Sequence, residues 1–177
     1  MTSDEAHRLR IACGAIIAVL VIIASVSAYR AYTLEKERKA FVEDVAQRFA
    51  PALLRLRGDV GLLLYHIRSN SSADTLIYVS ALTRDNALAV AKAYELLYRY
   101  THDQRYRRLS TAFRELGTAI NTIMNRGPQL KRILEEKRSA LEQLDGVMEE
   151  LRGVKSLKDV PESVAEDISR IARELTP

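Results

Sequence analysis

Residues 11–29 read IACGAIIAVLVIIASVSAY and contain no charged side chain. As a helix at ~1.5 Å per residue, this stretch would span roughly 28 Å, close to the ~30 Å of a bilayer's hydrocarbon core. Arg10 and Arg30 flank the stretch, and Tyr29 and Tyr32 lie where aromatic residues are expected to meet the lipid headgroups. We therefore expect a transmembrane helix over residues 11–29 that ties the remaining chain to the lipid bilayer.

A cleaved secretory signal is the alternative interpretation of the same stretch. Arg8 and Arg10 resemble a basic n-region, and residues 26–28 (Val-Ser-Ala) fit a small-residue cleavage site. The apolar run is longer than a typical signal h-region of roughly 7–15 residues. Its length favours a retained anchor, whereas cleavage would leave a mature chain that begins at Tyr29.

Two arguments predict opposite orientations of the chain in the membrane. Arg30, Lys36, Arg38 and Lys39 follow the span, and a count of basic residues would place that side in the cytoplasm. A basic segment before the span, by contrast, resembles a signal n-region, and long domains translocate largely regardless of charge. We favour a single-pass protein of the cell membrane with its domain on the extracytoplasmic side.

Composition limits the class of protein. The chain has 177 residues, of which 47% are hydrophobic and 28% charged, so a disordered chain is not expected. The net charge of +4 is mild, and no nucleic-acid partner is expected without clustered charge on one face. Cys13 is the single cysteine, which excludes an intrachain disulfide and a Cys/His zinc site. We expect no metal and no cofactor.

The order of segments predicts a simple organisation. A short tail (1–10) precedes the transmembrane helix (11–29), a charged helical stalk (30–40) follows, and a helical domain occupies 41–177. Glu35 and Lys39 form a favourable i,i+4 pair on the stalk. Outside the predicted transmembrane helix, the alternating pattern of residues that is typical of β-strands is nearly absent. We expect an all-α protein with one N-terminal transmembrane helix and an antiparallel helical bundle of four or five helices.

Helical periodicity and breaking residues predict the elements of the bundle. Breaks are expected at Pro51, at 69–74 (SNSSAD, with Ser71 and Asp74 as a helix start), at 101–104 (THDQ), at 125–129 (NRGPQ) and at Gly153. We also expect the helix to be weakened around Gly58 and Gly61. Apolar residues three and four apart predict the buried faces. They are Leu76, Val79, Thr83, Ala87, Val90, Tyr94 and Leu97; then Tyr106, Leu109, Phe113, Leu116, Ile120 and Ile123; and finally Val164, Ile168, Ile171 and Leu175.

A regular stripe from residue 130 to 151 has the spacing of coiled-coil a and d positions, with Lys137 in its seam. We expect one helix there that packs in the bundle. The same stripe is a candidate surface for helix association between chains. Its members are Leu134, Leu141, Leu144, Met148 and Leu151.

The segment YELLYRYTHDQRYRR (94–108) interleaves tyrosine with arginine. Such a patch suits phosphates, carboxylates or lipid headgroups. The alternative is a helical hairpin whose tyrosine rings pack inward while the arginines stay in solvent. The candidate anion or partner patch consists of Arg99, Arg105, Tyr106, Arg107 and Arg108.

Catalytic constellations are not visible in the sequence. His7, His66 and His102 are isolated, and neither a glycine-rich phosphate loop nor a Ser/His/Asp grouping stands out. We expect a non-enzymatic, membrane-anchored interaction or scaffold module that associates with a protein partner or with itself. The alternative function is an extracytoplasmic, sensor-like bundle that binds an anionic ligand through the Arg/Tyr patch.

Overall fold

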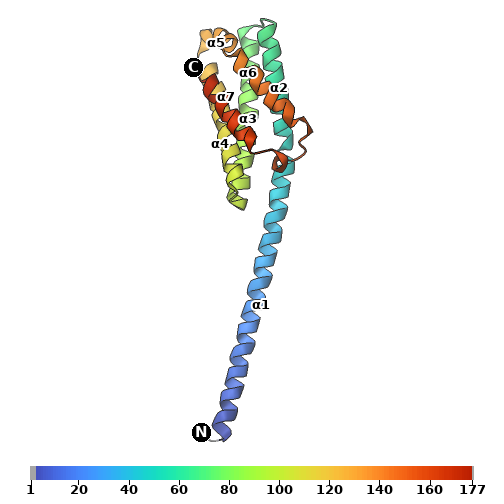
Figure 1. Cartoon of the computed structure of the whole chain (residues 1–177), viewed down its shortest axis with the longest axis vertical. Helices are drawn as coiled ribbons and strands as arrows, with labels where there is room; N and C mark the ends of the chain where they lie inside the picture. The colour runs from blue at the N-terminus through green and yellow to red at the C-terminus, as the bar shows by residue number, and fades with distance from the viewer. Residues whose placement is uncertain (1–2, 177) are drawn as a thin grey trace. The chain divides into compact units, whose positions relative to one another are not determined.

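A computed structural model describes the backbone of residues 3–176 and the side chains of residues 17–176 (Figure 1). The described part is helical and contains no strand, in agreement with the all-α expectation. The chain divides after Phe41 into two compact units.

The first unit consists of most of helix α1 (Ser3–Arg48). This helix is long and apolar enough to cross a membrane. Its large apolar side chains face outward, with Ile17, Leu20 and Ile22 each about 60% exposed (61%, 60% and 60%). Farther along, the predicted pair forms, with Lys39 Nζ 2.8 Å from Glu35 Oε1.

The helix break predicted near Pro51 lies at Phe49, where α1 ends and α2 (Ala50–Arg68) begins. Pro51 occupies the first turn of α2, where its missing N–H costs no helical hydrogen bond. The weakening expected at Gly58 and Gly61 does not interrupt α2, because the residues around the two glycines supply a buried face. That face consists of Leu53, Leu56, Val60, Leu63, Leu64 and Ile67.

Helix α3 (Ala73–Thr101) begins one residue later than the capping pattern suggests. Ser72 is the N-cap, and its hydroxyl accepts a hydrogen bond from Thr75 N at 3.3 Å. The predicted cap, Ser71, instead lies 2.9 Å from the His66 ring through its hydroxyl. The prediction of Ser71 as the cap was therefore wrong.

Helix α4 (Gln104–Met124) follows the predicted turn. His102 ends α3 in the left-handed region at φ 58°, and the Asp103 carboxylate caps α4 by accepting from Arg105 N at 2.9 Å. After α4, Gly127 has φ +51°, a conformation that favours glycine, and it opens a short 3₁₀ helix (Gly127–Gln129). The NRGPQ break is thus where it was predicted.

The predicted single helix over the 130–151 stripe is two helices, α5 (Leu130–Glu136) and α6 (Arg138–Glu150). Lys137 separates them, although its backbone still bonds to Ile133 O at 2.9 Å. Its Nζ donates to Glu174 O at 2.6 Å and to Thr176 O at 3.3 Å, which satisfies carbonyls at the end of α7 (Ser163–Leu175). The break raises the number of α-helices described after α1 to six, rather than four or five.

Within the second unit, α3 packs against α2 and α4, α4 against α7, and α6 against α2 and α7. All of the predicted inner positions on α3, α4 and α7 are buried. Two further 3₁₀ helices, Leu151–Gly153 and Leu157–Asp159, connect α6 to α7. The periodicity of the sequence therefore identified the core correctly.

Helices α4 and α7 run in the same direction, unlike the antiparallel neighbours expected from the sequence. Near their first turns, Arg108 Nη1 lies 2.7 Å from Glu162 Oε1. Near their last turns, Thr122 and Thr176 line the same cavity. The parallel direction follows from the connection, because α5, α6 and the 3₁₀ segments return the chain before α7 begins (Figure 1).

Tyr94 stands at the centre of the core and ties three segments together. It is fully buried, and its ring stacks on Tyr106 (centroids 6.1 Å apart) and Phe113 (5.8 Å) of α4. Its hydroxyl donates to Leu157 O at 3.1 Å. Burial raises the pKa of the Tyr94 phenol far above its ordinary value, so the group stays a neutral donor at every physiological pH.

Candidate functional site: a groove between α4 and α7

The residues of the predicted Arg/Tyr patch divide between core and surface. Tyr106 is buried, with 5% of its surface exposed, and packs on Tyr94 as the helical-hairpin alternative expects. Arg105 lies over the Tyr106 ring, 4.7 Å from the centroid, and its Nη2 donates to the phenol oxygen at 2.9 Å. These two residues therefore form part of the packing at the start of α4.

Arg99 belongs to a network of charges centred on one carboxylate. The Glu95 carboxylate pairs with Arg99 on the same helix and with Arg114 of α4, the latter at 3.1 Å. Burial acts to raise the pKa of Glu95, but the charges of Arg99, Lys92 and Arg114 outweigh it and lower that pKa. Arg99 is thus paired within α3, while Arg114 joins the same carboxylate to α4.

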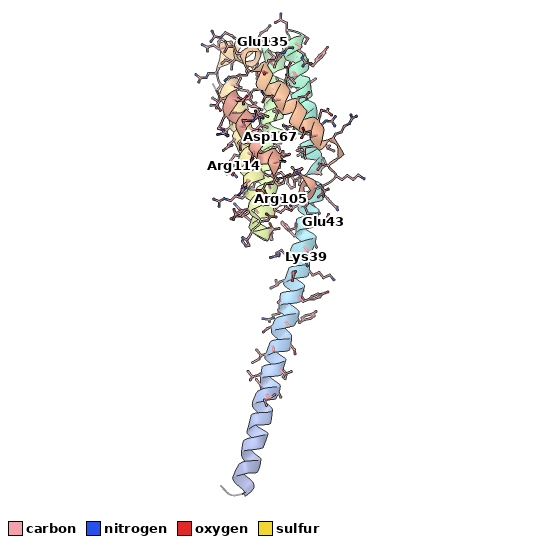
Figure 2. All side chains as sticks on the ribbon, viewed as in Figure 1. Lys39, Glu43, Arg105, Arg114, Glu135 and Asp167 are labelled. Atoms are coloured by element: carbon pink, nitrogen blue, oxygen red, sulfur yellow. The ribbon has the colours of Figure 1, made fainter. Side chains whose placement is uncertain are left out.

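Arg107 and Arg108 reach a cavity that the sequence did not indicate. A groove of about 620 Å³ lies between α4 and α7. Its lining residues are Gln104, Arg107, Arg108 and Thr111 from α4 and Ala165, Glu166, Ser169 and Arg173 from α7. We call it the α4/α7 groove. Arg114 of α4 and Asp167 of α7 mark the two helices in Figure 2.

The guanidinium groups along the groove differ in their interaction partners. Arg108 is paired with Glu162. Arg107 lies 5.9 Å from the Tyr98 ring centroid, and Arg173 Nε donates to Ser169 O at 3.2 Å. Among residues 17–176, neither Arg107 nor Arg173 has a carboxylate within salt-bridge distance. Two arginines in one groove therefore form no ion pair with the acidic side chains described, although Glu166 also lines the groove.

Arg173 and Ser169 were missed by sequence analysis. They lie 66 and 62 residues beyond Arg107 and line the same groove only because α7 packs alongside α4. The signal that was present is their spacing, because Glu166, Ser169 and Arg173 recur three and four residues apart on one polar face of α7. That periodicity identifies a polar face but does not say which helix lies beside it.

The candidate helix-association stripe lies in the core of the second unit. Its five members are between 0% and 4% exposed: Leu134, Leu141, Leu144, Met148 and Leu151. They pack on α2, α7 and neighbouring segments of the same chain. The chain itself therefore covers this stripe, in agreement with a helix that packs in the bundle.

Groups of three or more metal-ligating side chains do not occur among the residues that the structure describes. The comparison of the chain with protein-family models, with curated proteins and with solved structures finds no match in any of the three.

Proposed function

We propose that this chain is a single-pass, membrane-anchored protein whose helical bundle is a non-enzymatic interaction module. In this proposal, residues 11–29 of α1 span the bilayer and the bundle lies on the extracytoplasmic side. Helices α2, α3, α4 and α6 pack as antiparallel neighbours, with α7 parallel to α4. The module acts by binding a protein partner or a second copy of itself.

The contrast between the two units carries this proposal. Along α1, residues 17–32 are all exposed, and they include a continuous apolar surface that water would solvate poorly. The second unit, by contrast, has a buried apolar core of its own. Seven of its large apolar side chains stay exposed: Leu54, Leu62, Tyr65, Ile77, Tyr78, Leu88 and Tyr100. An apolar helix attached to a unit with its own core is the arrangement expected of an anchor, because lipid satisfies the helix while the unit folds around its own core.

Site-specific photocrosslinking in the intact membrane tests the interaction module. The full chain would carry a photoreactive residue at Thr111 in the α4/α7 groove, and a matched chain would carry it at Glu135, an exposed position on α5. We expect a discrete crosslinked species from Thr111 and none from Glu135. If neither these positions nor others spread over the exposed bundle surface gave such a species, the interaction module would be refuted.

A second candidate function is a sensor that binds an anionic ligand, and the unpaired charges of Arg107 and Arg173 favour it. Charge-assisted bonds from arginine suit carboxylate and phosphate groups. A ligand that binds only the folded state raises the unfolding temperature of the full chain. Such a rise with inorganic phosphate, lost in Arg107→Gln/Arg173→Gln, would support the sensor, and no shift at low salt would refute it.

A further inference from the structure

The α4/α7 groove continues into a second cavity. That cavity, of about 350 Å³, is also lined by Thr111 and Arg173, and it extends to Thr122 and Thr176. From Gln104 to Thr122 the groove follows α4 for roughly 27 Å at ~1.5 Å per residue. A phosphate or a single carboxylate would fill only a small part of this length, whereas an extended segment of about eight residues at ~3.3 Å each would match it.

The floor of the continuous groove consists of small side chains. Ala165 and Ala172 of α7 and Ala119 of α4 line it, with 4%, 3% and 3% of their surfaces exposed. Because alanine projects only one methyl group, a second backbone can lie close to this floor without displacing either helix. The floor provides contact along its length rather than a pocket for one group.

The threonine hydroxyls on the α4 side of the groove are not free to donate hydrogen bonds to a charged ligand. Thr111, Thr118 and Thr122 donate to carbonyls one turn earlier on their own helix, at 3.1, 2.9 and 2.9 Å. Their protons are thus used within α4. Recognition of a charged ligand falls to the arginines.

Arginines outnumber carboxylates along the two joined cavities. Arg107, Arg108, Arg114 and Arg173 line them, against Glu115 and Glu166. Arg108 and Arg114 already pair with Glu162 and Glu95, in exposed ion pairs of the kind that contributes little to stability. The groove therefore offers positive charge at Arg107 and Arg173, which have no ion-pair partner among the side chains that the structure describes.

We propose that the α4/α7 groove docks an acidic segment of a partner protein, whose carboxylates meet Arg107 and Arg173 while its backbone lies along the alanine floor. This inference rests on the proposed interaction module and names the chemistry of its partner. The partner segment is extended because the groove is long, and it is acidic because Arg107 and Arg173 in the groove have no ion-pair partner in the described part of the chain.

Binding of octaglutamate to the full chain in nanodiscs tests the inference. Fluorescence anisotropy of labelled octaglutamate would be compared with that of labelled octaglutamine, which has the same length but no charge. We expect octaglutamate alone to bind, with an affinity that falls as salt rises. Arg107→Gln/Arg173→Gln should weaken binding by at least about tenfold, and Arg132→Gln, an exposed arginine of α5 outside the groove, should change it by less than about twofold.

Three outcomes would overturn the inference. Equal weakening by Arg132→Gln would indicate diffuse attraction to net charge, and inorganic phosphate that competes as well as octaglutamate would indicate a small-anion site. No binding of octaglutamate at low salt would refute the groove's role altogether. The conservative double variant Arg107→Lys/Arg173→Lys should bind better than the glutamine pair, which separates lost charge from lost folding. A failure here leaves the crosslinking test of the interaction module unaffected.

Discussion

Replacing Tyr94 by phenylalanine should destabilise the bundle through one hydrogen bond. The ring keeps its stacking on Tyr106 and Phe113, so packing is conserved. What is lost is the donor to Leu157 O at 3.1 Å, in a site where Tyr94 and Leu157 are both 0% exposed. A buried carbonyl left without its donor costs about 1–3 kcal/mol, and we expect the free energy of unfolding to fall by that amount.

Urea unfolding of the full chain in detergent, followed by circular dichroism, measures this change. Tyr78→Phe on the same helix is the matched control, because Tyr78 is 64% exposed and its loss of a hydroxyl should change stability by less than about 0.5 kcal/mol. Hydrogen exchange should also accelerate in the segment around Leu157, whose carbonyl accepts the Tyr94 hydrogen bond. Equal stabilities of the two variants would refute the proposed role of the Tyr94 hydroxyl.

The remaining predictions concern glycines and one carboxylate. Gly58→Ala should stabilise the chain by about 1 kcal/mol, since a Cβ there meets nothing within 4 Å and alanine is the better helix former; unchanged or lower stability in urea would contradict this. Gly117→Ala should instead destabilise by about 1–2 kcal/mol, because its Cβ would lie 2.8 Å from Leu88 Cδ2, and a gain in stability would contradict the close approach of α3 and α4. The lowered pKa of Glu95 contributes stability above the ordinary glutamate pKa of 4.5, and this contribution is lost as pH falls through the lower folded-state pKa. Urea unfolding at neutral and acidic pH should accordingly show a smaller acid loss in Glu95→Gln than in the parent chain, and equal losses would contradict the ion pairs of Glu95.

The sequence predicted the core well because helical periodicity is a local signal. On α3, for example, Leu76, Val79 and Leu97 were identified from spacing alone and are buried. The same signal did not reveal the break at Lys137. A lysine in an apolar seam looks like a tolerated polar residue, whereas its partners, the carbonyls at the end of α7, are brought near only by the fold.

The candidate site was predicted in part. Arg107 and Arg108 lie at the groove, but Arg99 and Tyr106 are engaged with Glu95 and Tyr94 of their own chain. Charge and aromatic content alone could not separate these roles, because each depends on which side of a helix faces its neighbour. The contribution of α7 to the groove required knowledge of the parallel α4/α7 pair, which no local pattern encodes.

Membrane anchoring is the claim on which the account depends most, and one measurement tests it directly. Membranes containing the full chain would be washed with alkaline carbonate, and the N-terminus of the chain in each fraction would be determined by mass spectrometry. Retention in the pellet, with residues 11–29 still attached, is the predicted result. A chain that begins at Tyr29 and is recovered in the supernatant would contradict the anchor and, with it, the proposed function at the membrane.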